Sequence, residues 1–162
     1  IKESTFAKSR INQEIQTIFI GGGTPTLLDP KELARIITHL KENFGFSQNI
    51  EITIEANPDS VNSEKLEKLR GIGINRISFG MQSSVSHVLK VLDRTHNPEN
   101  VANSVANAKS AGFDEINLDL IYGTPGESIS DWKQSIESAL APCVSAYAAK
   151  IPESAPVGPT IL

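Results

Sequence analysis

Three consecutive glycines at the end of a short apolar run are the first feature of this sequence that points to chemistry. Gly21–Gly23 directly follow Thr17–Ile20, whose β-branched and aromatic residues are typical of a buried strand. Glycine weakens a strand end because it loses the most backbone entropy on folding, and the usual compensation is the close approach of a ligand or another chain. The simpler interpretation is a tight strand–helix turn without a ligand, although one glycine would suffice for that turn.

Polar side chains recur near the ends of three later segments in which apolar and polar residues alternate. These segments are Ile50–Ala56, Ile74–Gln82 and Glu115–Tyr122, and each has one apolar and one polar face when read as a strand. The polar side chains of interest are Glu55, Gln82, Asn117 and Asp119. Taken singly, Glu55 and Gln82 could be ordinary turn or cap residues, and Arg94, in a later loop, could be a solvated surface arginine. Together they predict a pocket for a small charged cofactor.

The elements that would position these residues alternate between strand and helix. Helical patterns follow each predicted strand, and Asp29, Asn62 and Asn97 are expected to cap three of the helices. Apolar residues at helical spacing predict inward-facing stripes, one over Leu33, Ile36, Ile37, Leu40 and Phe44 and another over Trp132, Ile136 and Leu140. A short final strand is predicted at Val144–Ala148. Such alternation predicts parallel strands joined by right-handed crossovers, either in a doubly wound sheet or in a (β/α) barrel. Strands of a doubly wound sheet are covered on both faces and should be apolar throughout. The polar faces seen here therefore favour an α/β fold of the (β/α) barrel type, with the ligand at the carboxyl ends of the strands.

Composition narrows the functional classes. The 162 residues amount to about one domain, and a net charge of −4 without a Lys/Arg block argues against a nucleic-acid surface. No apolar run approaches the roughly 18 residues of a membrane span. The single cysteine, Cys143, excludes an internal disulfide framework and suits a reducing cytoplasm. We expect one α/β core over residues 1–150 and an irregular, proline-rich tail over residues 151–162.

Several common kinds of site are not supported by the residues. His96 and Cys143 have no partners at metal-ligand spacing, so no metal site is predicted within the chain. The glycine run lacks the Gly-Lys-Ser/Thr ending of a P-loop, and no nucleophile elbow is present. An unrelated phosphate-binding barrel, with Gly21–Gly23 as an anion nest, stays open as an alternative.

Five ordered motifs carry a resemblance to a known family. They are Gly21–Thr26, Ile54–Pro58, Phe79–Ser83, Leu92–His96 and Asn117–Gly126. In order and spacing they resemble the radical S-adenosylmethionine (SAM) family, specifically the oxygen-independent coproporphyrinogen III oxidases and the related heme chaperones of the HemN/HemW group. The resemblance covers about residues 17–147.

The resemblance implies a partial (β/α) barrel that binds SAM and a 4Fe–4S cluster held by a Cys-x-x-x-Cys-x-x-Cys loop. Residues at the family's SAM-contacting positions are Gly22, Gly23, Thr24, Glu55, Gln82, Arg94 and Asp119. Glu55 can balance an ammonium or sulfonium charge, and Arg94 can bind a carboxylate through two parallel hydrogen bonds.

The sequence departs from the family in lacking the three-cysteine segment, and Cys143 alone cannot hold a cluster. We therefore expect a fragment that retains part of a SAM pocket and is inactive by itself. The motifs around Arg94 and at Gly123–Glu127, followed by Asp131-Trp132, look closer to the heme-chaperone branch, whose implied partners are heme or porphyrin and heme-accepting proteins. A coproporphyrinogen III oxidase and a non-catalytic heme carrier are the alternatives within this resemblance.

Overall fold

The computed structural model describes residues 1–11, 13–94 and 97–150, and its elements alternate between helix and strand after a first short helix. Their bounds are α1 Lys2–Ala7, β1 Ile15–Ile20, α2 Pro30–Phe44, β2 Phe46–Ala56, α3 Ser63–Gly71, β3 Arg76–Gln82, α4 Ser86–Val91, α5 Pro98–Ser110, β4 Glu115–Leu120 and α6 Ile129–Lys150. Short 3-10 turns occupy Lys8–Arg10, Pro25–Leu27 and Pro58–Ser60. The irregular tail predicted over residues 151–162 lies outside the described residues.

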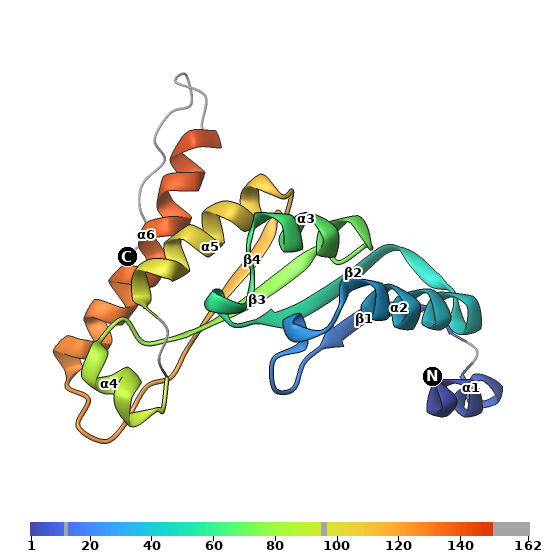
Figure 1. The fold of residues 1–162 in the computed structure, drawn as a ribbon, viewed down its shortest axis with the longest axis horizontal. Coiled ribbons are helices and arrows are strands. Elements are labelled where there is room, and N and C mark those ends of the chain that lie inside the picture. Colours follow the sequence, from blue (N-terminus) through green and yellow to red (C-terminus); the bar gives the residue numbers. More distant parts are fainter. Residues whose placement is uncertain (12, 95–96, 151–162) are drawn as a thin grey trace.

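The four described strands form one sheet in the order β1-β2-β3-β4, and every neighbouring pair is parallel (Figure 1). Strands that neighbour each other in sequence also neighbour each other in space, which is the arrangement of a barrel wall rather than of a doubly wound sheet, where the strand order reverses. The α/β fold predicted from the alternating pattern is therefore confirmed, and the sheet has the form of part of a (β/α) barrel.

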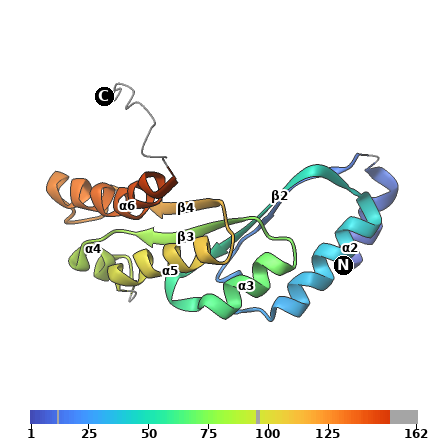
Figure 2. The ribbon, with the colours of Figure 1, turned by 90° about the horizontal axis from the view of Figure 1, so that it is seen from above.

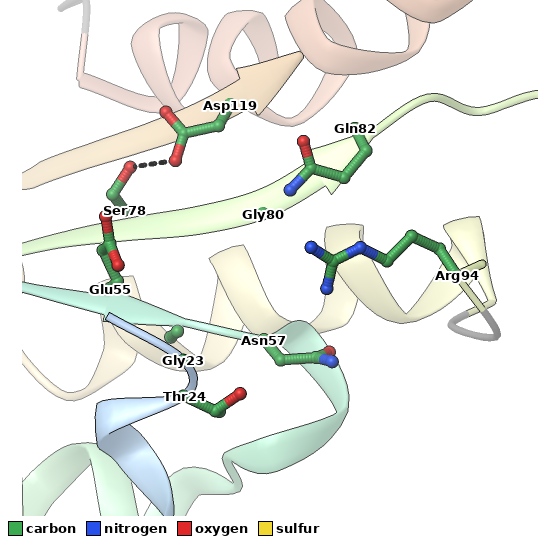
Figure 3. A pocket seen from close by; sticks show the side chains of 10 residues that line it. Gly23, Thr24, Glu55, Asn57, Ser78, Gly80, Gln82, Arg94 and Asp119 are labelled. Atoms are coloured by element: carbon green, nitrogen blue, oxygen red, sulfur yellow. Dashed lines mark hydrogen bonds between the residues drawn. The ribbon is translucent and has the colours of Figure 1, made fainter. Parts of the chain in front are cut away.

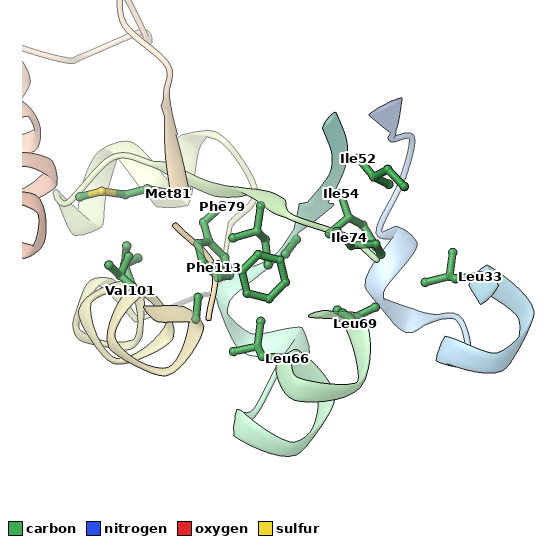
Figure 4. Close-up of a cluster of buried hydrophobic side chains, with 14 of the residues drawn as sticks. Leu33, Ile52, Ile54, Leu66, Leu69, Ile74, Phe79, Met81, Val101 and Phe113 are labelled. Carbon is green, nitrogen blue, oxygen red and sulfur yellow. The ribbon is translucent and has the colours of Figure 1, made fainter. Parts of the chain in front are cut away.

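The apolar face of the sheet packs on helices α2, α3 and α5, which lie along the same side (Figure 2). Strand residues such as Ile54, Ile77 and Phe79 are fully buried there. The helices contribute every third or fourth residue to the same core (Figure 4): Leu33 and Ile37, Leu66 and Leu69, and Val101, Val105 and Ala108. Burial of these side chains stabilises the sheet on one face. The opposite face of the sheet is polar and carries the candidate functional site.

Three helices begin at side-chain caps that the sequence predicts. Asp29 accepts a hydrogen bond from the Lys31 N–H at the start of α2. Asn62 and Asn97 do the same at the starts of α3 and α5. Each cap satisfies one of the backbone donors that a helix leaves unpaired at its first turn, so these boundaries are confirmed.

The predicted strand at Val144–Ala148 is wrong, because α6 continues through Pro142 to Lys150. The segment is rich in alanine, the strongest helix former, and a five-residue alternation does not distinguish a strand from the end of a helix. Helix α1 lies in the polar approach to the first strand, for which no element is predicted.

Two predicted apolar stripes are only partly buried. Ile36 on α2 is 40% exposed, and on α6 Ile136 and Leu140 are 36% and 54% exposed. Spacing alone predicted these residues on the inner faces of their helices, but only Leu33 and Ile37 reach the core from α2. Within the described part of the chain, no helix has the length and apolar character that crossing a membrane requires.

Candidate functional site

A pocket of about 240 Å³ lies at the carboxyl ends of the strands, on the polar face of the sheet (Figure 3). It is lined by Gly23, Thr24, Glu55, Ala56, Asn57, Ser78, Gly80, Gln82, Arg94 and Asp119. Six of the seven residues that the sequence nominates are therefore in one place, and the seventh, Gly22, is tied to it by a hydrogen bond to Glu55. The carboxylates of Glu55 and Asp119 belong to the same face of the sheet.

The glycine loop is held against the end of β2. The Gly22 N–H donates to Glu55 Oε2 at 3.0 Å. A Cβ on Gly21 would lie 3.0 Å from that same carboxylate and 2.9 Å from the Phe19 ring, so a larger residue would push these side chains from their present positions. Gly22 and Gly23 have φ values of +90° and +61°, a region that glycine enters without steric cost. Two reasons for the glycine run are therefore visible within the chain: the positive φ values of Gly22 and Gly23 and the close approach of the Glu55 side chain. The approach of a ligand stays a prediction, and the loop backbone lines the edge of the pocket at Gly23.

The end of β3 carries a β-bulge that places Gln82. The register with β4 shifts between Gly80 and Gln82, and Gln82 has a φ of +61°, which is uncommon for a residue other than glycine. A Cβ on Gly80 would lie 2.7 Å from Gln82 Nε2, so any larger residue would displace this amide from its present position. Strained backbone of this kind clusters at ligand-binding sites.

Two buried serines hold the bulged end of β3 to α6. Ser83 Oγ and Ser135 Oγ are 3.0 Å apart and both side chains are fully buried. The Ser84 N–H also donates to Ser135 Oγ, at 3.1 Å. This contact between residues 52 positions apart in sequence fixes the chain just after Gln82.

Arg94 reaches the pocket from the loop after α4. Its backbone N–H donates to the Leu89 carbonyl at 2.9 Å, and the preceding Asp93 has a φ of +52°. The side chain extends from this loop so that the guanidinium lies beside the Gln82 amide and Asn57 (Figure 3). A planar guanidinium in this position can bind a ligand carboxylate through two hydrogen bonds.

Four lining residues are absent from the set that the sequence nominates: Ala56, Asn57, Ser78 and Gly80. Ser78 and Gly80 share a strand face with Gln82 in the alternating pattern, so the same signal contained them. Ser78 Oγ donates to Asp119 Oδ2 at 2.8 Å (Figure 3). Asn57 caps the turn at Pro58–Ser60 by accepting from the Asp59 N–H, and a turn residue gives no separate sign of a pocket.

The donor set of the pocket favours an organic ligand that carries charges of both signs. Glu55 and Asp119 offer carboxylates to a cation, while Arg94 offers donors to an anion. The described residues contain no group of three His, Cys, Asp or Glu side chains that could hold a metal ion. With one cysteine in the sequence, the chain cannot supply the several thiolates that a 4Fe–4S cluster requires.

Comparison with known proteins defines the class of this chain. The family model of the radical SAM superfamily matches residues 5–139, which is most of the sequence. The chain therefore belongs to the radical SAM superfamily, whose members use SAM together with a 4Fe–4S cluster, and the resemblance stated from the motifs is confirmed.

The relatives place the chain more narrowly. It is 42% identical over 137 residues to the heme chaperone HemW of Mycobacterium tuberculosis, covering 83% of this chain and 35% of that protein. It is 38% identical over 138 residues to HemW of Bacillus subtilis, covering 85% and 36%. Among solved structures, coproporphyrinogen III oxidase (HemN) from Escherichia coli, a radical SAM enzyme, superposes with a TM-score of 0.78 at 29% identity, over 87% of this chain and 33% of that one. The chain thus spans about a third of the length of these relatives.

Proposed function

We propose that this chain forms part of the SAM-binding wall of a radical SAM protein of the heme-chaperone type. The observation that carries the proposal is the single pocket that gathers the glycine loop, two carboxylates and one guanidinium. In this role Arg94 binds the carboxylate of the SAM methionine moiety and Glu55 faces its ammonium or sulfonium charge, while Gly23 and Thr24 offer backbone and hydroxyl groups. Gln82 and Asp119 complete the contacts.

The room around the glycine loop supports this ligand. A Cβ at Gly22 or Gly23 would meet no atom within 4 Å, so the loop leaves open space that a small ligand can enter. SAM supplies a 5′-deoxyadenosyl radical when it is cleaved beside a reduced cluster. The residues present fit SAM and do not fit the cluster, so the chain's own part is to bind and orient SAM.

We further propose that the whole protein binds heme and passes it to heme-accepting proteins, in a reducing cytoplasm. Support comes from relatives named as heme chaperones at 38–42% identity. The likeness to coproporphyrinogen III oxidase supports a porphyrin-oxidising enzyme as the second candidate. A titration of the full-length protein with heme, beside a SAM-cleavage assay on the same protein, separates the candidates. Heme binding with SAM cleavage fits the radical SAM chaperone, and heme binding without cleavage fits a non-catalytic carrier. Porphyrin oxidation fits the enzyme.

The first test of SAM binding is the substitution Arg94→Ala. Removal of a charged hydrogen-bond donor to the ligand carboxylate should weaken SAM binding by about tenfold or more, as measured by isothermal titration calorimetry on the 162-residue chain. The matched control is Arg35→Ala on α2, where the arginine side chain is 66% exposed and forms an ion pair with Glu32. SAM affinity should not change in this variant.

Two results would overturn the SAM assignment. One is a wild-type chain that shows no heat of SAM binding at millimolar ligand. The other is a chain whose thermal unfolding is shifted upward by inorganic phosphate but not by SAM, which would support the phosphate-binding alternative.

A further inference from the structure

Asp119 belongs to a closed hydrogen-bond network with two neighbouring side chains. Besides the hydrogen bond from Ser78 to Oδ2, Asn117 Nδ2 donates to Asp119 Oδ1 at 2.7 Å. Asn117 Nδ2 also donates to Ser78 Oγ at 3.0 Å. The hydroxyl hydrogen of Ser78 and both amide hydrogens of Asn117 are therefore used within the network, and each carboxylate oxygen receives one donor.

The sheet register creates this network. Ser78 lies opposite Asn117 and Gly80 lies opposite Asp119 in the parallel β3–β4 pair. Alternation along both strands places all four residues on the polar face. Because Gly80 has no side chain, the Gln82 amide can occupy the place beside it on β3, with Nε2 2.7 Å from where a Cβ would lie. The Asp119 carboxylate turns toward Ser78 (Figure 3).

The network leaves part of the Asp119 carboxylate free to accept hydrogen bonds from a ligand. A carboxylate has about four acceptor positions, and the two donors from Ser78 and Asn117 occupy one on each oxygen. A donor at both oxygens fixes the plane of the group, while the remaining positions stay available in the pocket that Asp119 lines. Ser78 is 5% exposed, so water cannot readily take over its donor role if the hydroxyl is removed.

We propose that Ser78 and Asn117 are positioning residues that hold the Asp119 carboxylate in one orientation, ready to accept hydrogen bonds from donor groups of the bound cofactor. The proposal rests on the assignment of this pocket to SAM. The two residues act through Asp119 and need not touch the ligand. Orienting the acceptor before binding reduces the freedom that must be lost when the ligand arrives, which is the general advantage of a preorganised site.

The test is a double-mutant cycle on SAM affinity in the 162-residue chain. Ser78→Ala should weaken SAM binding by about tenfold, and Ser78→Thr, which keeps the hydroxyl, should restore most of the affinity. In an Asp119→Ala background the further change Ser78→Ala should have almost no effect, because the group that Ser78 orients is gone.

The matched control is Ser104→Ala. Ser104 is also 5% exposed and donates a hydrogen bond to the Pro58 carbonyl at 3.0 Å, and neither residue lines the pocket. Loss of the Ser104 hydroxyl should lower the stability toward urea about as much as Ser78→Ala does, while SAM affinity stays unchanged. If Ser78→Ala fails to fold, Asn117→Ala replaces it in the same cycle, with the same expectation.

The outcomes separate this proposal from the proposed function. A wild-type chain that does not bind SAM removes both. A wild-type chain that binds SAM, together with a Ser78→Ala variant of unchanged affinity, overturns the positioning role alone. Equal losses from Ser78→Ala with and without Asp119 also overturn it, because Ser78 would then act independently of the carboxylate.

Discussion

Glu55 connects the backbone and side-chain parts of the site. One carboxylate oxygen accepts from the Gly22 N–H, so the glycine loop is ordered by the same residue that we propose to face the positive charge of the ligand. The other oxygen can accept from a ligand donor without breaking this contact. The site is therefore partly preorganised at the residue scale. Glu55 lies at the lip, and Asp119 accepts hydrogen bonds from Ser78 on β3 and from Asn117 on its own strand, β4.

Gly21→Ala tests the role of the close approach between the loop and Glu55. The new Cβ would lie 3.0 Å from the Glu55 carboxylate, which must move and lengthen its hydrogen bond to Gly22. We expect SAM affinity to fall by about tenfold with little loss of stability. Gly22→Ala is the contrasting variant: its Cβ meets open space, but a φ of +90° is strained for alanine, so we expect about 1–2 kcal/mol lower stability toward urea. Unchanged SAM affinity in Gly21→Ala would contradict this account.

At the scale of elements, the site depends on how strand ends are tied to helices. The bulge at the end of β3 turns Gln82 into the pocket, and the buried pair Ser83–Ser135 holds the following residues to α6. Helix α6 in turn begins with a reciprocal capping box: the Ser128 N–H donates to Asp131 Oδ2 at 2.8 Å, and the Asp131 N–H donates to Ser128 Oγ at 3.2 Å. The start of α6 is thus fixed on the side that carries Ser135.

The features of the fold and site that depend on local sequence pattern could be predicted from the sequence. Strand alternation predicts which face carries Glu55 and Asp119, and capping residues predict where α2, α3 and α5 begin. Features that depend on contacts between two segments distant in sequence could not be predicted in this way. The bulge at Gln82 arises from the register of β3 with β4, and the Ser78 role requires Asn117 on the next strand. The helical end of α6 was missed because five residues carry too little periodicity to outweigh alanine-rich helix propensity.

The capping box of α6 gives stability a defined pH dependence. Hydrogen bonds from Ser128 lower the pKa of Asp131, with the larger effect from its hydroxyl and the smaller from its backbone N–H. Nearby His87 also lowers this pKa. Because the folded-state pKa is lower than the unfolded one, the stabilisation is complete above the unfolded pKa and is lost as the pH falls through the folded value. Asp131→Ala should therefore unfold at lower urea concentration than wild type at neutral pH, and the difference should shrink in acid. A difference that is the same at both pH values would contradict the linkage.

On the scale of the whole molecule, the sheet has a covered face and a functional face. Helices α2, α3 and α5 pack on the apolar side (Figure 2), while the polar side carries the pocket and its network. The core can therefore hold the strands in register while Ala56 is the one apolar side chain among the described residues that line the pocket. This separation explains how the sheet carries charged residues at the carboxyl ends of its strands, since their partners are polar neighbours and, in our proposal, a charged cofactor.

The whole chain should bind SAM without assembling an iron–sulfur cluster, because the sequence has a single cysteine and a 4Fe–4S cluster needs several thiolates. After anaerobic treatment with iron and sulfide followed by desalting, we expect neither the visible absorption of a cluster nor its electron paramagnetic resonance signal on reduction. Calorimetry on the same sample should still detect SAM.

The Cys143→Ser variant provides the control for adventitious iron, since any absorption caused by iron bound at that thiolate should disappear with it. The electron paramagnetic resonance signal of a reduced 4Fe–4S cluster separates a true cluster from such iron. If that signal survives desalting in wild type and is lost in Cys143→Ser, copies of the chain share a cluster. That result would overturn the expectation that the cluster lies outside the chemistry of these 162 residues.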